Sequence, residues 1–133
     1  MKKNAVYDFI QAFLRKEKVT LFHDIDSEFD FIYIEDVVHA LVMSLEWENE
    51  VINVSTGHSV TLKELYEVIK ELMQYEVPLA YSGELVRVRV DNTKLKALGW
   101  QSRYSLKEGV ARTIESFKES TLKTVRTSTK EDM

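Results

Sequence analysis

The sequence has no cysteine, one proline and four glycines among its 133 residues. Without cysteine, the chain can form neither a disulfide nor a thiolate metal site, and it has no thiol nucleophile. The glycines are Gly57, Gly83, Gly99 and Gly109. Because they do not cluster, they cannot form the glycine-rich turn through which many proteins approach the pyrophosphate of a dinucleotide. Cysteine chemistry is therefore excluded, and the sequence carries no dinucleotide-binding loop.

An excess of charge of one sign is also absent. The formal net charge is −4 and no basic patch contains interleaved aromatic residues, so we expect neither nucleic acid nor an anionic membrane as a partner. No apolar run approaches the roughly 20 residues that a membrane-spanning helix needs. With 44% apolar and 30% charged residues, the chain suits one soluble globular domain. Met1–Asn4 leads into an amphipathic helix, which is not a signal peptide, so we place the protein in the cytoplasm.

The centre of the chain predicts a strand followed by a helix. Phe31–Ile34 is a dense apolar run, which is typical of a strand buried on both faces, as in a parallel sheet. Asp36 can then cap a helix, because its carboxylate can accept hydrogen bonds from free N–H groups of the first turn. Apolar residues recur behind it at helical spacing, at Val37, Val38, Leu41, Val42 and Leu45.

A second strand and helix are predicted directly afterwards. Val51–Ser55 predicts a short strand, and Gly57 supplies a flexible turn. Thr61–Glu64 has the pattern of a capping box, which starts a helix over Leu62–Met73. Periodicity and turn residues predict the remaining elements: helix Ala5–Lys16, strand Val19–Phe22, strand Val77–Tyr81, strand Val86–Val90, a short helix from Asp91 to Gly99, and a helix from Ser105 to about Glu119. Residues 120–133 lack apolar periodicity and predict a disordered polar tail.

Five blocks of the sequence resemble one protein family. They are DFIYIEDVVHAL, VINVSTG, TLKEL, DNTKLKALGW and SLKEGVARTIE. In this order and spacing they resemble the C-terminal half of the NAD-dependent epimerase/dehydratase family, the extended short-chain dehydrogenases/reductases that modify nucleotide sugars. The resemblance implies an α/β fold: the C-terminal substrate-binding lobe plus the last strand-helix unit, over residues 1–119, with the N-terminal Rossmann half missing.

The resemblance also implies that the catalytic half is missing. The family uses a tyrosine with a lysine four residues later as its acid–base pair. Tyr66 and Lys70 have that spacing, but in the family the pair lies upstream of every matching block, so we interpret the spacing as coincidence. We expect no cofactor in this chain, although NAD(P) serves the complete family enzyme. A split enzyme, a truncated gene product and an isolated C-terminal piece all remain open.

Four residues are candidates for binding a nucleotide-diphosphate sugar. By resemblance, Thr20 and Phe22 lie beside the nucleotide base, although Phe22 could instead belong to the core. Asn53 matches an asparagine near the diphosphate and could alternatively brace the turn that follows it. Arg87 is the fourth candidate, because its planar guanidinium suits phosphate oxygens.

Other interpretations apply to the arginines, and one residue departs from the family at the expected binding surface. Arg87 could lie on a solvated strand face, which it shares with Arg89, a weaker candidate. Phe29 departs from the family, because many members have an arginine at this position, and a phenyl ring cannot neutralise a diphosphate. His23, His39 and His58 have no spacing typical of a metal site.

Two functional hypotheses follow. The first is the substrate-binding part of a nucleotide-sugar epimerase, dehydratase or reductase, which is active only with a partner chain that carries the Rossmann domain. The second is a non-catalytic binding or interaction module, or a decayed remnant of such an enzyme. Because the missing half would leave the strand Phe31–Ile34 with open edges, we also expect self-association as an alternative to the partner chain.

Overall fold

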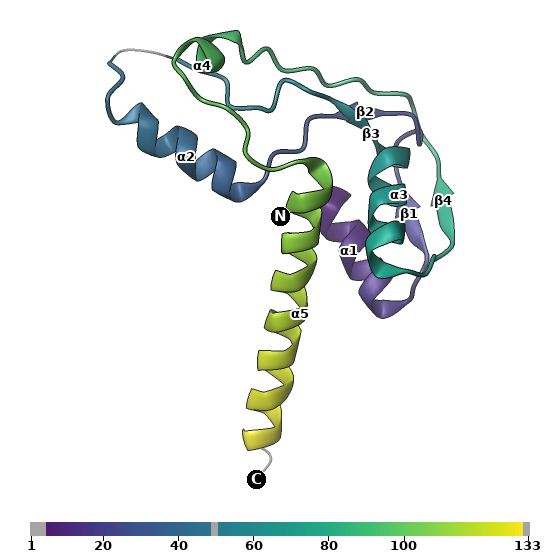
Figure 1. Ribbon diagram of the computed structural model, residues 1–133. Coiled ribbons are helices and arrows are strands. Elements are labelled where there is room, and N and C mark those ends of the chain that lie inside the picture. The colour runs from purple at the N-terminus through teal and green to yellow at the C-terminus, as the bar shows by residue number, and fades with distance from the viewer. Residues whose placement is uncertain (1–4, 49–50, 132–133) are drawn as a thin grey trace.

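The structure is a computed structural model that describes residues 5–48 and 51–131. Figure 1 shows a layered body of helices α1 and α3 with strands β1 and β4, from which two extended connections lead to helices α2 and α4. The long helix α5 begins beside α1 and projects away from the body. No helix in these two ranges is long and apolar enough to cross a membrane.

Two small sheets connect the helices. Strand β1 (Val19–Leu21) pairs in parallel with β4 (Leu79–Tyr81), with Thr20 opposite Ala80. This confirms the strands predicted over Val19–Phe22 and Val77–Tyr81, each slightly shorter than expected. Strand β2 (Glu28–Phe29) pairs antiparallel with β3 (Val60–Thr61). Each of the two sheets has two strands.

The larger core lies between three helices and β1. Helix α1 (Ala5–Arg15) and helix α3 (Leu62–Met73) bury their apolar faces against each other and against the start of α5 (Leu106–Glu131). The fully buried side chains at its centre are Phe9, Ile10, Phe13, Leu65 and Ile69. Both helices agree with the predictions over Ala5–Lys16 and Leu62–Met73.

The helix starts predicted at Thr61 and Ser105 are both confirmed. The Thr61 hydroxyl accepts a hydrogen bond from the Glu64 N–H at 3.0 Å at the start of α3. The Ser105 hydroxyl accepts one from the Glu108 N–H at 3.1 Å at the start of α5. Each bond satisfies an N–H group that the helix itself leaves unpaired.

A smaller core joins α2 (Ile34–Ser44) to α4 (Thr93–Ala97) through Ala40, Leu95 and Trp100. Gly99 has a φ of 97°, which L side chains rarely adopt, and the chain turns there so that Trp100 folds back onto α4. The Trp100 indole N–H donates to the Asp36 carbonyl at 3.1 Å. The short helix predicted between Asp91 and Gly99 is therefore confirmed.

The strand predicted at Phe31–Ile34 is wrong. Residues 30–33 are extended but pair with no strand, and α2 already begins at Ile34 with Tyr33 as its N-cap. Within the described ranges, the backbones of Phe31 and Ile32 make no hydrogen bond. A parallel strand needs a neighbour that supplies complementary N–H and C=O groups, and residues 5–48 and 51–131 provide none here.

The capping role predicted for Asp36 is also wrong. Asp36 lies inside the first turn of α2 and is almost completely buried. Its carboxylate accepts hydrogen bonds from the Arg103 N–H and the Ser102 hydroxyl, both at 2.9 Å. The side chain therefore holds the loop before α5 against α2.

The strands predicted at Val51–Ser55 and Val86–Val90 do not form either. Among the described residues, an isolated bridge between Glu28 and Arg87 is the one β-type pairing of the second segment. Side chains take the place of a regular ladder: the Ser55 hydroxyl donates to the Val90 carbonyl at 3.3 Å, and the Ser59 hydroxyl to the Val88 carbonyl at 2.8 Å. The alternating sequence is thus extended without belonging to a sheet.

Helix α5 continues to Glu131, beyond the end predicted at about Glu119. Residues 120–131 are helical in place of the disordered tail that their composition predicts. They contain neither glycine nor proline, so no residue forces the helix to end. The division of the chain into residues 1–119 and a tail of residues 120–133 stays a prediction.

Candidate functional site

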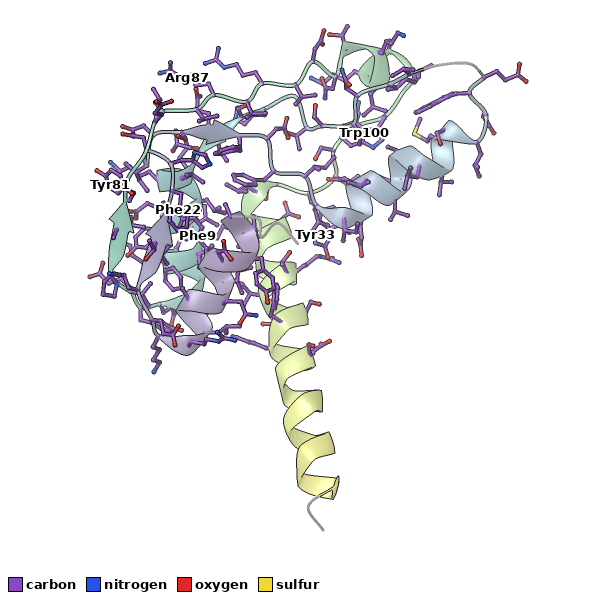
Figure 2. The ribbon with its side chains drawn as sticks, turned by 180° about the vertical axis from the view of Figure 1, so that it is seen from behind. Phe9, Phe22, Tyr33, Tyr81, Arg87 and Trp100 are labelled. Atoms are coloured by element: carbon purple, nitrogen blue, oxygen red, sulfur yellow. The ribbon has the colours of Figure 1, made fainter. Side chains whose placement is uncertain are left out.

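Strand β1 presents two of the predicted site residues to solvent. Burial alternates along it, with Val19 and Leu21 buried and Thr20 exposed. Phe22 follows directly, and 79% of its surface is exposed. Figure 2 shows Phe22 near Tyr81, in the part of the body that also holds Phe9. The alternative that Phe22 belongs to the core is therefore wrong, and both side chains are accessible to a ligand.

A tight turn fixes the backbone at Phe22. The Ser82 N–H donates to the Leu21 carbonyl and the Asp24 N–H to the Glu84 carbonyl, each at 3.1 Å. Gly83 lies between them with a φ of 121°, and a Cβ at this position would collide with the Phe22 carbonyl oxygen. Glycine is therefore required, and the turn holds the end of β1 in one conformation.

Arg87 and Arg89 share one acidic partner. The Arg87 Nε lies 3.0 Å from Glu28 Oε2, and an Arg89 Nη lies 3.3 Å from the same oxygen. The two arginine side chains are 59% and 72% exposed, while that of Glu28 is only 22% exposed. Arg87 is thus on an exposed face, as one alternative predicted, but it is not free of contacts.

Asn53 is exposed and makes one weak contact, from its amide to the Asp91 carbonyl at 3.5 Å. The turn after it is braced instead by Asp30. This carboxylate accepts from the Thr56 N–H at 3.1 Å, the Thr56 hydroxyl at 2.7 Å and the Gly57 N–H at 2.9 Å. Sequence reasoning missed this role, because Asp30 lies 26 residues from Thr56 and no local pattern signals the contact.

Three of the four predicted residues adjoin or belong to one extended segment, residues 81–92, whereas Thr20 lines a separate hollow between α1 and β1. Phe22 adjoins its first turn, Arg87 belongs to its middle, and Asn53 contacts its end at Asp91. In the part of the chain that the structure describes, no hydrogen bond or ring contact joins Phe22, Asn53 and Arg87 to one another. The predicted residues therefore lie at separate points of the surface and do not line one shared pocket.

Phe29 occupies the position where the resemblance leads one to expect an arginine. Its ring packs between His23 and Phe31, with centroid separations of 5.8 and 6.1 Å. Phe29 thus contributes apolar packing in β2, and the preceding residue of the strand, Glu28, binds Arg87 and Arg89.

Tyr66 and Lys70 use their polar groups for separate contacts. The Tyr66 hydroxyl is buried and donates to the Val77 carbonyl at 2.6 Å. Lys70 lies 3.2 Å from a Glu67 carboxylate oxygen, and this hydrogen bond raises the pKa of the lysine. These contacts agree with the interpretation that their spacing is coincidental.

A groove of about 500 Å³ lies elsewhere, between α1, the extended residues 30–34 and α5. Apolar side chains dominate its lining, including Val6, Phe31 and Phe117. At its rim the Tyr104 hydroxyl donates to the Glu35 carboxylate, which raises the pKa of Tyr104. None of the four predicted site residues lines this groove. Over the described ranges, no group of histidine, aspartate and glutamate side chains is arranged to hold a metal.

Known proteins match this chain in sequence and in structure. The NAD dependent epimerase/dehydratase family model matches residues 2–55. A UDP-glucose 4-epimerase of Mycolicibacterium smegmatis is 32% identical over 83% of this chain and 37% of its own. The solved UDP-glucose 4-epimerase of Thermotoga maritima with UDP-glucose is 32% identical, with a TM-score of 0.84 over 91% of this chain and 41% of its own. That of Thermus thermophilus in complex with NAD is 27% identical, with a TM-score of 0.76 over 86% of this chain and 40% of its own.

The fold is that of a part of an extended short-chain dehydrogenase/reductase. The chain matches the NAD-dependent epimerase/dehydratase family model over residues 2–55 and is similar to UDP-glucose 4-epimerases over most of its own length, as the five sequence blocks predicted. It spans 37% to 41% of the length of the relatives just described.

Proposed function

We propose that this chain is the substrate-binding part of an NAD(P)-dependent nucleotide-sugar epimerase, dehydratase or reductase, and that it is not catalytically complete alone. The observation that carries the proposal is its close match to about 41% of a UDP-glucose 4-epimerase structure. The sequence has neither a glycine-rich loop nor a suitable tyrosine–lysine pair. NAD(P) and the catalytic groups would therefore come from outside these residues. The cytoplasm is the compartment we propose.

The ligand would lie along the open surface of residues 81–92. Phe22 offers an exposed ring on which a nucleotide base can stack, and Thr20 adds a hydroxyl on the same strand. Arg87 provides a guanidinium for the diphosphate, with Asn53 as an amide donor further along. These four residues are the proposed contacts to the nucleotide-diphosphate sugar.

A partner would cover α2. This helix turns a row of apolar side chains to solvent, which we name the α2 stripe: Ile34, Val38, Leu41, Val42 and Leu45, between 48% and 84% exposed. The unpaired extended residues Phe31 and Ile32 adjoin it. A chain that carries the Rossmann domain would bury this surface, and a second copy of this chain is the alternative.

The same stripe favours a second candidate function, a non-catalytic interaction module or a remnant of the enzyme. Such a protein would use α2 to bind its partner and would have no need of a nucleotide sugar. Ligand binding at Arg87 and Phe22 discriminates the two candidates, because only the first requires it.

A thermal melt of the chain tests the proposal. UDP-glucose, dTDP-glucose, GDP-mannose and NAD would each be added in large excess. A ligand at about 100 times its dissociation constant stabilises the folded state by about 2.7 kcal/mol, which raises Tm by several degrees. We expect one nucleotide sugar to raise Tm and NAD to leave it unchanged. A melt that no nucleotide sugar shifts would contradict substrate binding.

The Arg87→Ala variant locates the binding surface. It should weaken binding of the stabilising nucleotide sugar by about 1.5 to 3 kcal/mol, the usual contribution of a hydrogen bond to a charged group. Lys94→Ala is a suitable control, because it also removes one exposed positive charge but belongs to α4. If both variants bind like the wild type, Arg87 belongs only to a solvated face.

A further inference from the structure

Glu28 is held more firmly than the two arginines that contact it. Its N–H donates to the Val86 carbonyl and its carbonyl accepts from the Val88 N–H, both at 2.8 Å, on either side of Arg87. Its side chain is mostly buried, whereas both guanidinium groups are mostly exposed at the ends of long side chains. The carboxylate is therefore fixed, and the arginines are the groups that can move.

Both guanidinium groups converge on a single oxygen atom, Glu28 Oε2, at 3.0 and 3.3 Å. Within residues 5–48 and 51–131, Glu28 is the only salt-bridge partner of Arg87 and Arg89. The convergence demonstrates that the two side chains can bind one anionic oxygen together. Ion pairs as exposed as these contribute little to stability, so another anion can compete for the arginines.

We infer that Glu28 is an internal competitor for the phosphate-binding arginines, and that Arg87 and Arg89 bind one phosphate group of the ligand as a pair. This inference rests on the proposed function of the same surface. In the ligand-free chain the Glu28 carboxylate takes the place of a phosphate oxygen. A diphosphate carries more negative charge and more acceptor oxygens than one carboxylate, so the arginines move from Glu28 to the ligand when it binds.

The inference gives Arg89 a role equal to that of Arg87, although the sequence made Arg89 the weaker candidate. It also predicts the sign of the effect that Glu28 has on ligand affinity. Because its negative charge both occupies the guanidinium groups and repels the approaching diphosphate, Glu28 lowers the affinity for the ligand. If Glu28 only supported β2, replacing it would affect folding but would not selectively change the affinity for negatively charged ligands.

The Glu28→Gln variant tests this directly, with UDP-glucose and inorganic pyrophosphate as probes and isothermal calorimetry as the measurement. We expect Glu28→Gln to bind both probes about 3- to 10-fold more tightly than the wild type, and uridine, which has no phosphate, unchanged. In an Arg87→Ala/Arg89→Ala background, the same substitution should give no gain. Glu84→Gln is the matched control, because it removes an exposed negative charge in the same segment that contacts neither arginine.

Arg89→Ala provides a second, independent variant on the exposed surface. It should weaken binding of pyrophosphate by about 3- to 10-fold, as Arg87→Ala should. Equal or weaker pyrophosphate binding by Glu28→Gln, or unchanged binding by Arg89→Ala, overturns the inference. If pyrophosphate behaves as expected but no nucleotide sugar binds the wild type, the proposed function fails while the competition by Glu28 stands.

Discussion

The two cores of this protein differ in how completely they are enclosed. The larger core is surrounded by α1, α3, β1 and the start of α5, and five of its side chains have no exposed surface. The buried apolar residues of the smaller core are Ala40, Leu95 and Trp100, and the other face of its helix α2 is the exposed α2 stripe. The same chain therefore contains one part that is complete by itself and one part that is half covered.

This difference agrees with the share of the family fold that the chain spans. Where all partners of an element lie within the chain, as for α1 and α3, the apolar faces meet and disappear from the surface. Where partners are missing from the described residues, as for α2 and the extended residues 30–33, apolar side chains and backbone groups stay exposed. An incomplete core is thus recognisable from a helix that is apolar on two faces.

The largest expected effect is on the larger core. Phe9→Ala removes a ring with no exposed surface and should lower the free energy of unfolding by about 3 to 5 kcal/mol. Leu45→Ala, in the α2 stripe, should change it by less than about 0.5 kcal/mol, because 84% of that side chain is exposed. Urea unfolding followed by circular dichroism measures both. Equal losses of unfolding free energy in the two variants would contradict the difference between the enclosed larger core and the half-covered smaller one.

Asp36→Ala should produce the next largest effect, confined to the smaller core. Removing the carboxylate leaves the Arg103 N–H and the Ser102 hydroxyl without their acceptor and should cost about 1.5 to 3 kcal/mol. Hydrogen exchange should show faster exchange at the Arg103 amide and in α4, with α1 unchanged. Faster exchange throughout α1 would mean that the two parts unfold as one unit.

The α2 stripe should affect association more than stability. Leu41→Glu/Leu45→Glu places two charges on exposed positions, so the free energy of unfolding should change by no more than about 1 kcal/mol. Sedimentation velocity should show fewer oligomers than for the wild type. Leu98→Glu, which changes an exposed leucine next to α4, is the control and should leave association as it is. A wild-type chain that stays monomeric at high concentration would contradict self-association.

The smallest expected effect is a pH dependence at α4. Hydrogen bonds from the side chain and the backbone of Thr93 hold the pKa of the Asp91 carboxyl below its ordinary value of 3.8. Because the folded-state pKa is lowered, this contribution to stability is present above the ordinary pKa and is lost as pH falls through the lowered one. The stability advantage of the wild type over Asp91→Asn should therefore shrink below about pH 4. An advantage that is independent of pH would contradict the assignment.

Sequence reasoning succeeded where the deciding contacts are local. Thr61 and Ser105 meet partners three residues away, and the buried face of α1 follows from spacings of three and four residues. Gly99 ends α4 through its own backbone conformation. Each of these features depends on a short stretch of chain, so the residue types alone indicate it.

It failed where a distant partner decides. Phe31–Ile34 and Val51–Ser55 have strand-like composition, but a strand also needs a neighbour, and composition does not say whether the chain contains one. The donors to Asp36 lie 66 and 67 residues away, so a nearby capping role looked equally reasonable. At the candidate site, the sequence placed Arg87 and Arg89 on one face, while their shared contact with Glu28 became evident only from the fold.

Trp100, which packs under α2, has a spectroscopic consequence. The chain has two tryptophans, and both belong to the smaller core: Trp100 is buried there, and Trp47 packs partly against it. Intrinsic tryptophan emission therefore reports on the half-covered part alone, whereas far-ultraviolet ellipticity is dominated by the helices of the whole chain. If unfolding curves followed by the two signals coincide, the chain unfolds as one cooperative unit. If the emission changes at a lower denaturant concentration than the ellipticity, the half-covered part unfolds first.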